Sequence, residues 1–294
     1  MSAQSVLFDA PGPRARRNAW IANGVGILLL AGIAVVVLTR LGEKGQLDPD
    51  KWLPLFTSRS WLNFFLPGLQ NTLVAALYAI VLALAFGLLF GLGRLAPLAP
   101  VRWVCGTVVE FFRAVPVLMM MIVIYLGLGF SRVVDASLVP LIAVVGGLTL
   151  YNGAVIAELV RSGVFGLPRG QKEAAYAVGM THGQSLRVVE LPQALLAMLP
   201  SLVSQFVVIL KDSALGSWVT YGELLQFSRQ LGTSDGNLLQ TLLTAAVIFI
   251  VINYVLTRAA QYLASRISRR TAARTTAAPP AVLAGSARGT AGAA

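Results

Sequence analysis

Long apolar stretches, separated by short polar segments, dominate this chain of 294 residues. A helix needs about 20 consecutive apolar residues to span the hydrocarbon core of a bilayer, and several stretches reach this length. They cover residues 20–38, 67–92, 103–130, 138–165, 199–221 and 238–263. Their length and continuous hydrophobicity predict transmembrane helices, so we expect an all-α polytopic membrane protein with six spans. The composition agrees, because 56% of the residues are hydrophobic and only 12% are charged.

Basic residues are concentrated in alternate polar segments. Lys and Arg number 23 against 12 Asp and Glu, which gives a net charge of +11. If the N-terminus lies in the cytoplasm, 15 of these 23 residues fall in inner segments and six in outer ones. Cytoplasmic loops are enriched in Lys and Arg, so we expect a multi-pass protein of the cell membrane with both termini in the cytoplasm. Membrane lipid is an expected partner, and nucleic acid is not, because no soluble segment gathers the basic residues on one face.

The scarcity of reactive side chains argues against an enzyme. Cys105 and His182 are the single cysteine and the single histidine, which excludes an intrachain disulfide and a metal site of the Cys/His type. The sequence has no Gly-x-x-x-x-Gly-Lys-Ser/Thr phosphate loop, so we expect the chain itself to bind no ATP and no other cofactor. The sequence also lacks a pattern of paired catalytic carboxylates or an activated nucleophile.

The polar segment 166–198 lies between two apolar stretches and has a pattern of its own. Two short helices are predicted here, at about 173–178 and 183–189, with a tight turn at Gly179 between them. Leu191-Pro192 is expected to break the chain where it returns to the membrane. Two short helices of this kind can fit a groove on a partner protein. The residues expected in this docking loop are Gly170, Glu173, Ala174, Ala175, Gly179, His182, Leu191 and Pro192.

Charged residues inside the spans are candidates for a transport pathway, because each costs about 3 kcal/mol to insert into a membrane. Glu110 and Arg113 are three residues apart, so they either form a structural ion pair or contact a substrate at a gate. Glu158 and Arg161 repeat the spacing beside the docking loop, where an ion pair would stabilise the end of a helix. The candidate pathway or gate residues are Glu110, Arg113, Asn152, Lys211 and Asp212.

Three of these candidates leave two interpretations open. Asn152 either binds substrate or forms a hydrogen bond between helices. Lys211 and Asp212 are adjacent, so their side chains point to different faces of a helix, and at least one must face protein or a water-filled pathway. Either a gate or a packing contact between chains satisfies that requirement.

Several motifs resemble those of the permeases of ATP-binding-cassette (ABC) importers for polar amino acids. The docking loop has the spacing of that family's signature, with Glu-Ala-Ala at 173–175, then Gly179, then Leu-Pro at 191–192. Further similar motifs are Pro-Gly-Leu-Gln-Asn-Thr-Leu at 67–73, Val-Glu-Phe-Phe-Arg-Ala-Val-Pro at 109–116 and Leu-Lys-Asp-Ser at 210–213. The resemblance covers about residues 67–262, and the core is similar to glutamate-type permeases of high-GC Gram-positive bacteria.

This resemblance implies a five-helix importer core preceded by one extra helix. The implied partners are a dimer of ATPase subunits that hold ATP and Mg²⁺, a second permease subunit (identical or homologous), an extracellular solute-binding protein and an amino-acid substrate. The pair Gly87 and Gly91 is then suited to a contact between the two permeases. Together with the charge pattern and composition, this resemblance predicts four parts. They are a cytoplasmic tail (1–18), an extra helix with an extracellular segment (19–66), the permease domain (67–263) and a disordered cytoplasmic tail (264–294).

The alternative function is a secondary amino-acid transporter or a channel. A secondary transporter is expected to contain inverted repeats and ion-coupling carboxylates near the middle of the membrane. The two Glu-x-x-Arg pairs at 110–113 and 158–161 are too short to form such a repeat.

Overall fold

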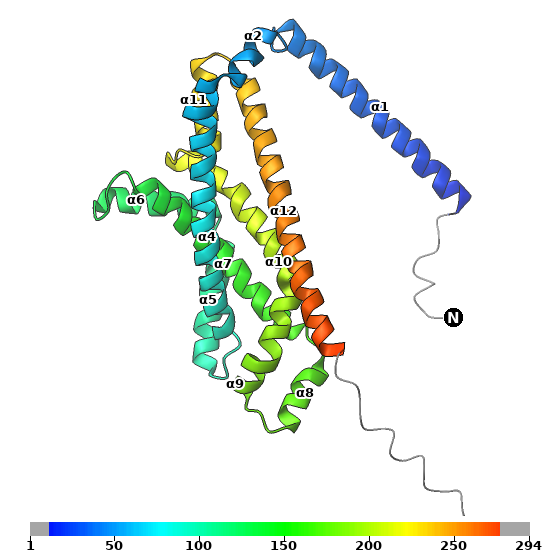
Figure 1. Ribbon diagram of the computed structural model, residues 1–294, viewed down its shortest axis with the longest axis vertical. Coiled ribbons are helices and arrows are strands. Elements are labelled where there is room, and N and C mark those ends of the chain that lie inside the picture. The colour runs from blue at the N-terminus through cyan, green and yellow to red at the C-terminus, as the bar shows by residue number, and fades with distance from the viewer. Residues whose placement is uncertain (1–11, 277–294) are drawn as a thin grey trace, which may run out of the picture.

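The computed structural model describes residues 12–276, which form helices and turns with no strand among them. Figure 1 shows α4, α7, α10 and α12 gathered into one elongated bundle, whereas α1 diverges from it. Five helical segments are long and apolar enough to cross a membrane, and one bent pair of helices is a sixth candidate. The expected all-α polytopic membrane protein is therefore confirmed.

The helices are named in chain order. They are α1 (Pro13–Glu43), α2 (Pro49–Trp52), α3 (Ser58–Ser60), α4 (Leu66–Gly93), α5 (Ala99–Ala114), α6 (Val117–Ser131), α7 (Val139–Phe165), α8 (Arg169–Ala177), α9 (His182–Ser185), α10 (Leu191–Asp212), α11 (Leu224–Ser234) and α12 (Leu238–Thr276). Short 3-10 or π segments join some of them, namely η2 (Leu53–Phe56), η3 (Trp61–Phe65), η4 (Leu186–Glu190) and η5 (Ser213–Val219).

Small residues bring α4 and α7 into close contact at the centre of the bundle. A Cβ atom added to Gly87 would lie 2.6 Å from Cβ of Ile156, and one added to Gly91 would lie 2.9 Å from Cβ of Val160. Such approach permits extensive van der Waals contact, which holds helices together in a membrane. The expected role of Gly87 and Gly91 between two permease chains is therefore wrong, because α7 of the same chain occupies that face.

The third expected span, 103–130, is broken. Helices α5 and α6 meet at 97°, with Val115 and Pro116 between them. Val115 is extended (φ −83°, ψ 129°), as expected for a residue whose helical conformation is disfavoured by a following proline. Consequently α6 leaves the bundle sideways, as Figure 1 shows.

Both ends of the described chain are more helical than the sequence suggests. Helix α1 begins at Pro13 and ends at Glu43, so it starts inside the expected N-terminal tail, and it buries none of its residues. Helix α12 continues to Thr276, so the expected disordered tail does not begin at residue 264. Residues 264–276 contain no glycine or proline and include alanine and arginine, which favour helix. The rest of the two expected tails, 1–11 and 277–294, lies outside the described residues.

Part of the expected extracellular segment, 51–65, is a series of short helices that cover one end of α11 and α12. Asn237 Nδ2 donates to the carbonyl oxygen of Lys51 at 3.0 Å, and Arg59 pairs with Asp235 at 3.2 Å. Phe65 is buried in an apolar cluster that includes residues of α11. This segment therefore belongs to the packed bundle.

Candidate functional site

The docking loop contains the two predicted helices, joined by a turn at Gly179. Helix α8 ends in a Schellman motif, in which Gly179 N donates to Tyr176 O at 3.0 Å and Met180 N donates to Ala175 O at 3.1 Å. Gly179 has φ +82°, a left-handed conformation that glycine adopts without steric cost. Thr181 then begins α9 with a capping box to Gln184. The turn therefore fixes how the two short helices follow one another.

His182 attaches this loop to the rest of the chain. Its Nε2 lies 3.1 Å from the carbonyl oxygen of Leu95, in the segment between α4 and α5, and its Nδ1 lies 3.1 Å from the hydroxyl of Tyr176 in α8. Because Leu95 O can only accept, Nε2 carries the proton in this arrangement. His182 thus connects α8, α9 and the α4–α5 segment through a single ring.

The outer face of the docking loop is open. Gly170, Glu173 and Ala174 are exposed, whereas Ala175 is buried. The expected break at Leu191-Pro192 is absent, because these residues begin α10 and Pro192 lies in its first turn. A proline is tolerated there, since the first N–H groups of a helix have no partner within it. The loop therefore continues without interruption into a helical segment that runs from His182 to Val219.

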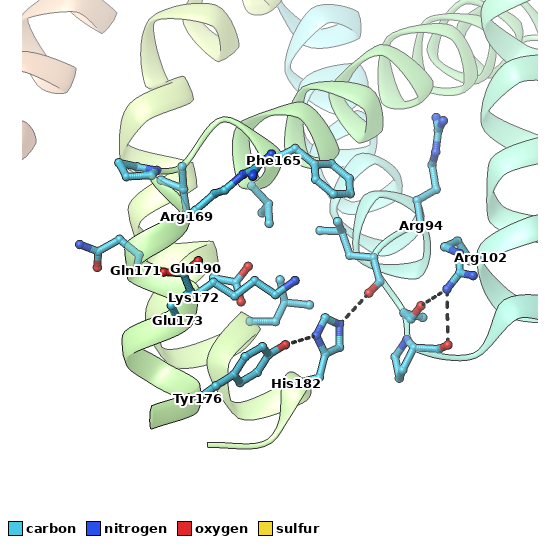
Figure 2. Close-up of a pocket in the computed structure, with 17 residues that line it drawn as sticks. Arg94, Arg102, Phe165, Arg169, Gln171, Lys172, Glu173, Tyr176, His182 and Glu190 are labelled. Atoms are coloured by element: carbon cyan, nitrogen blue, oxygen red, sulfur yellow. Dashed lines mark hydrogen bonds between the residues drawn. The ribbon is translucent and has the colours of Figure 1, made fainter. Parts of the chain in front are cut away.

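A cavity of about 840 Å³ lies between α8 and the α4–α5 segment. Figure 2 shows Arg169, Lys172 and Tyr176 on one side of it and Arg94 and Arg102 on the other. Arg102 donates to the carbonyl oxygens of residues 96 and 97 at 3.1 and 3.4 Å. Most of the charged groups around this cavity are therefore cationic.

The two Glu-x-x-Arg pairs form one charge network, which includes the cavity residue Arg94. Arg94 connects them, at 3.1 Å from Glu110 and 2.8 Å from Glu158. Arg113 lies 3.2 Å from Glu110 and 3.8 Å from Glu158, and Arg161 pairs with Glu158 one turn further along α7. Three arginines and two glutamates therefore link the end of α4, the end of α5 and α7. The expected ion pairs within helices are present, but neither is isolated.

The remaining candidate residues lie apart from this network. Asn152 is fully buried in α7, where Gln205 of α10 donates to its Oδ1 and its Nδ2 donates to Leu148 O at 2.9 Å. Lys211 Nζ lies 3.5 Å from the carboxylate of Asp212. The Lys211 side chain is 69% exposed, compared with 19% for Asp212. Lys211 therefore points away from the described bundle and Asp212 toward it.

At the opposite end of α4, motif residues secure the turn that precedes α11. Asn71 Nδ2 donates to Gly222 O at 2.7 Å, and the hydroxyl of Thr72 accepts from Leu224 N at 3.1 Å. Glu223, which is buried, caps α11 by accepting from the N–H groups of residues 225 and 226. Burial raises the pKa of Glu223 to about 7, although both hydrogen bonds oppose that shift.

Known proteins have related sequences and a similar fold. Residues 83–269 match the family described as the inner membrane component of binding-protein-dependent transport systems. The chain belongs to this family. The permease is 46% identical over 230 residues to the glutamate transport system permease protein GluD of Corynebacterium glutamicum, a match that covers 78% of this chain and 83% of GluD. It is 32% identical over 219 residues to the glutamate/aspartate import permease protein GltK of Escherichia coli, covering 72% of this chain and 95% of GltK.

A solved structure supports the same assignment. The crystal structure of an amino acid ABC transporter with histidines includes a chain that is 27% identical, with a TM-score of 0.66, covering 73% of this permease and 98% of that chain. The protein is therefore the multi-pass permease subunit of an ABC importer for polar amino acids, a membrane subunit that is not itself an ATPase.

Sequence reasoning missed two members of the site. Neither Arg94 nor Gln205 is among the candidate residues named from the sequence. Arg94 is 64 residues from Glu158 in the chain, and Gln205 is 53 residues from Asn152, so no local spacing indicates either contact. The one usable signal is that a polar residue inside a span needs a polar partner.

Proposed function

We propose that the docking loop of this permease binds an ATPase subunit, one of a pair that supplies the energy for uptake. The exposed residues Gly170, Glu173 and Ala174 form the surface of α8 that would enter a groove of the ATPase. Gly179, Leu191 and Pro192 would hold that surface in place, by the turn and by the start of α10. Support comes from the hydrogen bond of His182 to Leu95 O, which attaches the loop to the α4–α5 segment.

The complete importer would contain further subunits. A second permease, identical or homologous, would complete the translocation path, and an extracellular solute-binding protein would deliver the amino acid. ATP and Mg²⁺ would be held by the two ATPases, with no cofactor on this chain. Closure of the ATPases would move the docking loops and, with them, α7 and α10 as rigid bodies. The charge network at the base of α7 would transmit this movement to α5.

Side-chain exposure divides the candidate pathway residues into those that would line the path and those that would support it. Glu110 is 58% exposed, and Lys211 is 69% exposed, so these side chains are available to line a path beside a second permease. Arg113, at the break between α5 and α6, would act with Glu110 as a gate. Asn152 and Asp212 would have supporting roles, Asn152 through Gln205 and Asp212 beside Lys211.

Glutamate is the proposed substrate. The relatives named as glutamate or glutamate/aspartate permeases cover most of the core, and GluD is the more similar of the two. The test is ATP-dependent uptake of labelled glutamate into membranes that contain the permease and its partner subunits. We expect competition by excess unlabelled glutamate, and weaker competition by arginine and cystine. Uptake that persists after deletion of the ATPase would instead favour the secondary transporter or channel.

The proposed orientation places the docking loop and both termini in the cytoplasm. Its test uses single cysteines after Cys105→Ala has removed the native thiol. We expect Glu173→Cys to react with a membrane-impermeant maleimide in inverted vesicles but not in intact cells. Lys51→Cys, at the opposite end of the bundle, should react in intact cells. The reverse pattern would place the docking loop outside and contradict binding to an intracellular ATPase.

A further inference from the structure

The cavity beside α8 has a cationic lining that the transport function does not use. Four basic and two acidic residues line it. Arg94 is engaged by the charge network, the buried Glu190 accepts from the hydroxyl of Ser185 at 2.7 Å, and Glu173 is exposed. Within residues 12–276, Arg102, Arg169 and Lys172 form no ion pair. All three side chains line the cavity, Arg102 from α5 and Arg169 and Lys172 from α8, and Figure 2 shows Arg102 bonded to the carbonyl oxygens of the α4–α5 segment. The cavity is therefore suited to an anionic group.

An apolar groove adjoins this cavity and shares one of its cations. The groove, of about 940 Å³, runs along α5 and is lined by Arg102, Trp103, Gly106 and Phe111 among others. Trp103 and Phe111 are 73% and 61% exposed. Glu110 also borders the groove, but Arg94 and Arg113 lie within ion-pair distance of it. Arg102 therefore lies where a basic cavity meets an apolar surface, an arrangement that matches an amphiphile with an acidic head.

The position along the bundle agrees with a lipid. Phe165, which also lines the cavity, is the last residue of the candidate span α7, and Arg102 lies in the first turn of α5, where the bent pair α5–α6 begins. An exposed tryptophan such as Trp103 is typical of the membrane–water interface, where lipid headgroups lie. Basic pockets between helices at this level attract acidic headgroups.

We propose that an anionic phospholipid binds here, with its phosphate near Arg102, Arg169 and Lys172 and an acyl chain along α5. The lipid would join α5 to α8, because Arg102 belongs to the first and Arg169 and Lys172 to the second. A lipid bound in the cavity would therefore restrain the docking loop relative to α5. A free phosphate would use the cavity alone, whereas a lipid uses the cavity and the groove together.

Native mass spectrometry of the purified assembled transporter tests the site, with equal amounts of phosphatidylglycerol and phosphatidylcholine added. We expect preferential retention of phosphatidylglycerol, reduced about fivefold by Arg102→Ala alone and more than tenfold by Arg102→Ala with Lys172→Ala. Each basic residue near a lipid surface contributes about 1 kcal/mol, which corresponds to about a fivefold change. The control is Arg187→Ala, an exposed basic residue next to α9 outside the cavity, which should retain the lipid normally.

The outcomes separate the sources of the anionic group. Equal retention of both lipids, or an equal loss in Arg187→Ala, would overturn the proposal. Displacement of the lipid by millimolar inorganic phosphate, with no dependence on the acyl chains, would show a free-anion site instead and would also overturn it. The measurement requires no transport, so its failure leaves the proposed import of glutamate unaffected, and the failure of import leaves the lipid measurement interpretable.

Discussion

Gly179→Val is expected to lower ATP-driven uptake more than tenfold while leaving the permease in the membrane. The residue has φ +82°, and an added Cβ would meet no atom within 4 Å, so the substitution acts through the backbone alone. A β-branched residue in this conformation costs on the order of 1–3 kcal/mol. Relief of that strain would break the bonds from Gly179 N and Met180 N to α8. Helix α9 would then lose its fixed relation to α8, and ATP hydrolysis would no longer be coupled to transport.

Two further variants distinguish strain at the turn from a general disturbance of the loop. Asparagine tolerates the left-handed conformation better than most residues, so Gly179→Asn should retain most of the uptake. Gly183→Val places the same side chain in α9, where φ is not positive and no atom lies within 4 Å of the added Cβ. It should also transport. Uptake and ATP hydrolysis are measured together in proteoliposomes, and normal coupling in Gly179→Val would refute the role assigned to the turn.

The spans could be predicted from the sequence because a bilayer imposes their length and hydrophobicity. The turn at Gly179 could also be predicted from the sequence, since few residues other than glycine adopt its backbone conformation without cost. Both the spans and this turn depend only on residues that are adjacent in the chain, so local sequence patterns were sufficient to predict them.

Features that depend on distant residues could not be predicted. Pro116 indicates a break, but the 97° angle depends on where α6 packs against α7, where Met121 fits against Gly147. Pro192 has the appearance of a helix breaker, yet it lies in the first turn of α10, directly after the π turn η4. Arg94 resembles any basic residue beside a span until the fold brings it to Glu158. The sequence therefore indicates where the chain changes direction, and tertiary packing decides the direction and the partners.

Glu158→Gln is expected to have the largest effect within the charge network. Glu158 lies within ion-pair distance of Arg94, Arg113 and Arg161, and its side chain is only 22% exposed. Glutamine keeps the shape of the side chain but removes its charge, which leaves three arginines with Glu110 as the remaining anion of the network. Hydrogen bonds to charged groups contribute about 1.5–3 kcal/mol each. We expect a lower thermal unfolding temperature of the permease and a loss of uptake of about tenfold or more.

Glu110→Gln is the matched comparison, because it makes the same substitution in the same network at a more exposed position. Arg94 and Arg113 would each retain Glu158 as a partner, so the unfolding temperature should change little. If Glu110 lines the pathway, uptake should still fall, and the affinity for glutamate should change with it. Unfolding temperature and uptake are therefore measured on both variants. A parallel loss of stability and uptake in both variants would make Glu110 a structural residue. An unchanged unfolding temperature in Glu158→Gln would contradict the central position of Glu158, because removal of this carboxylate leaves three clustered arginines nearly uncompensated.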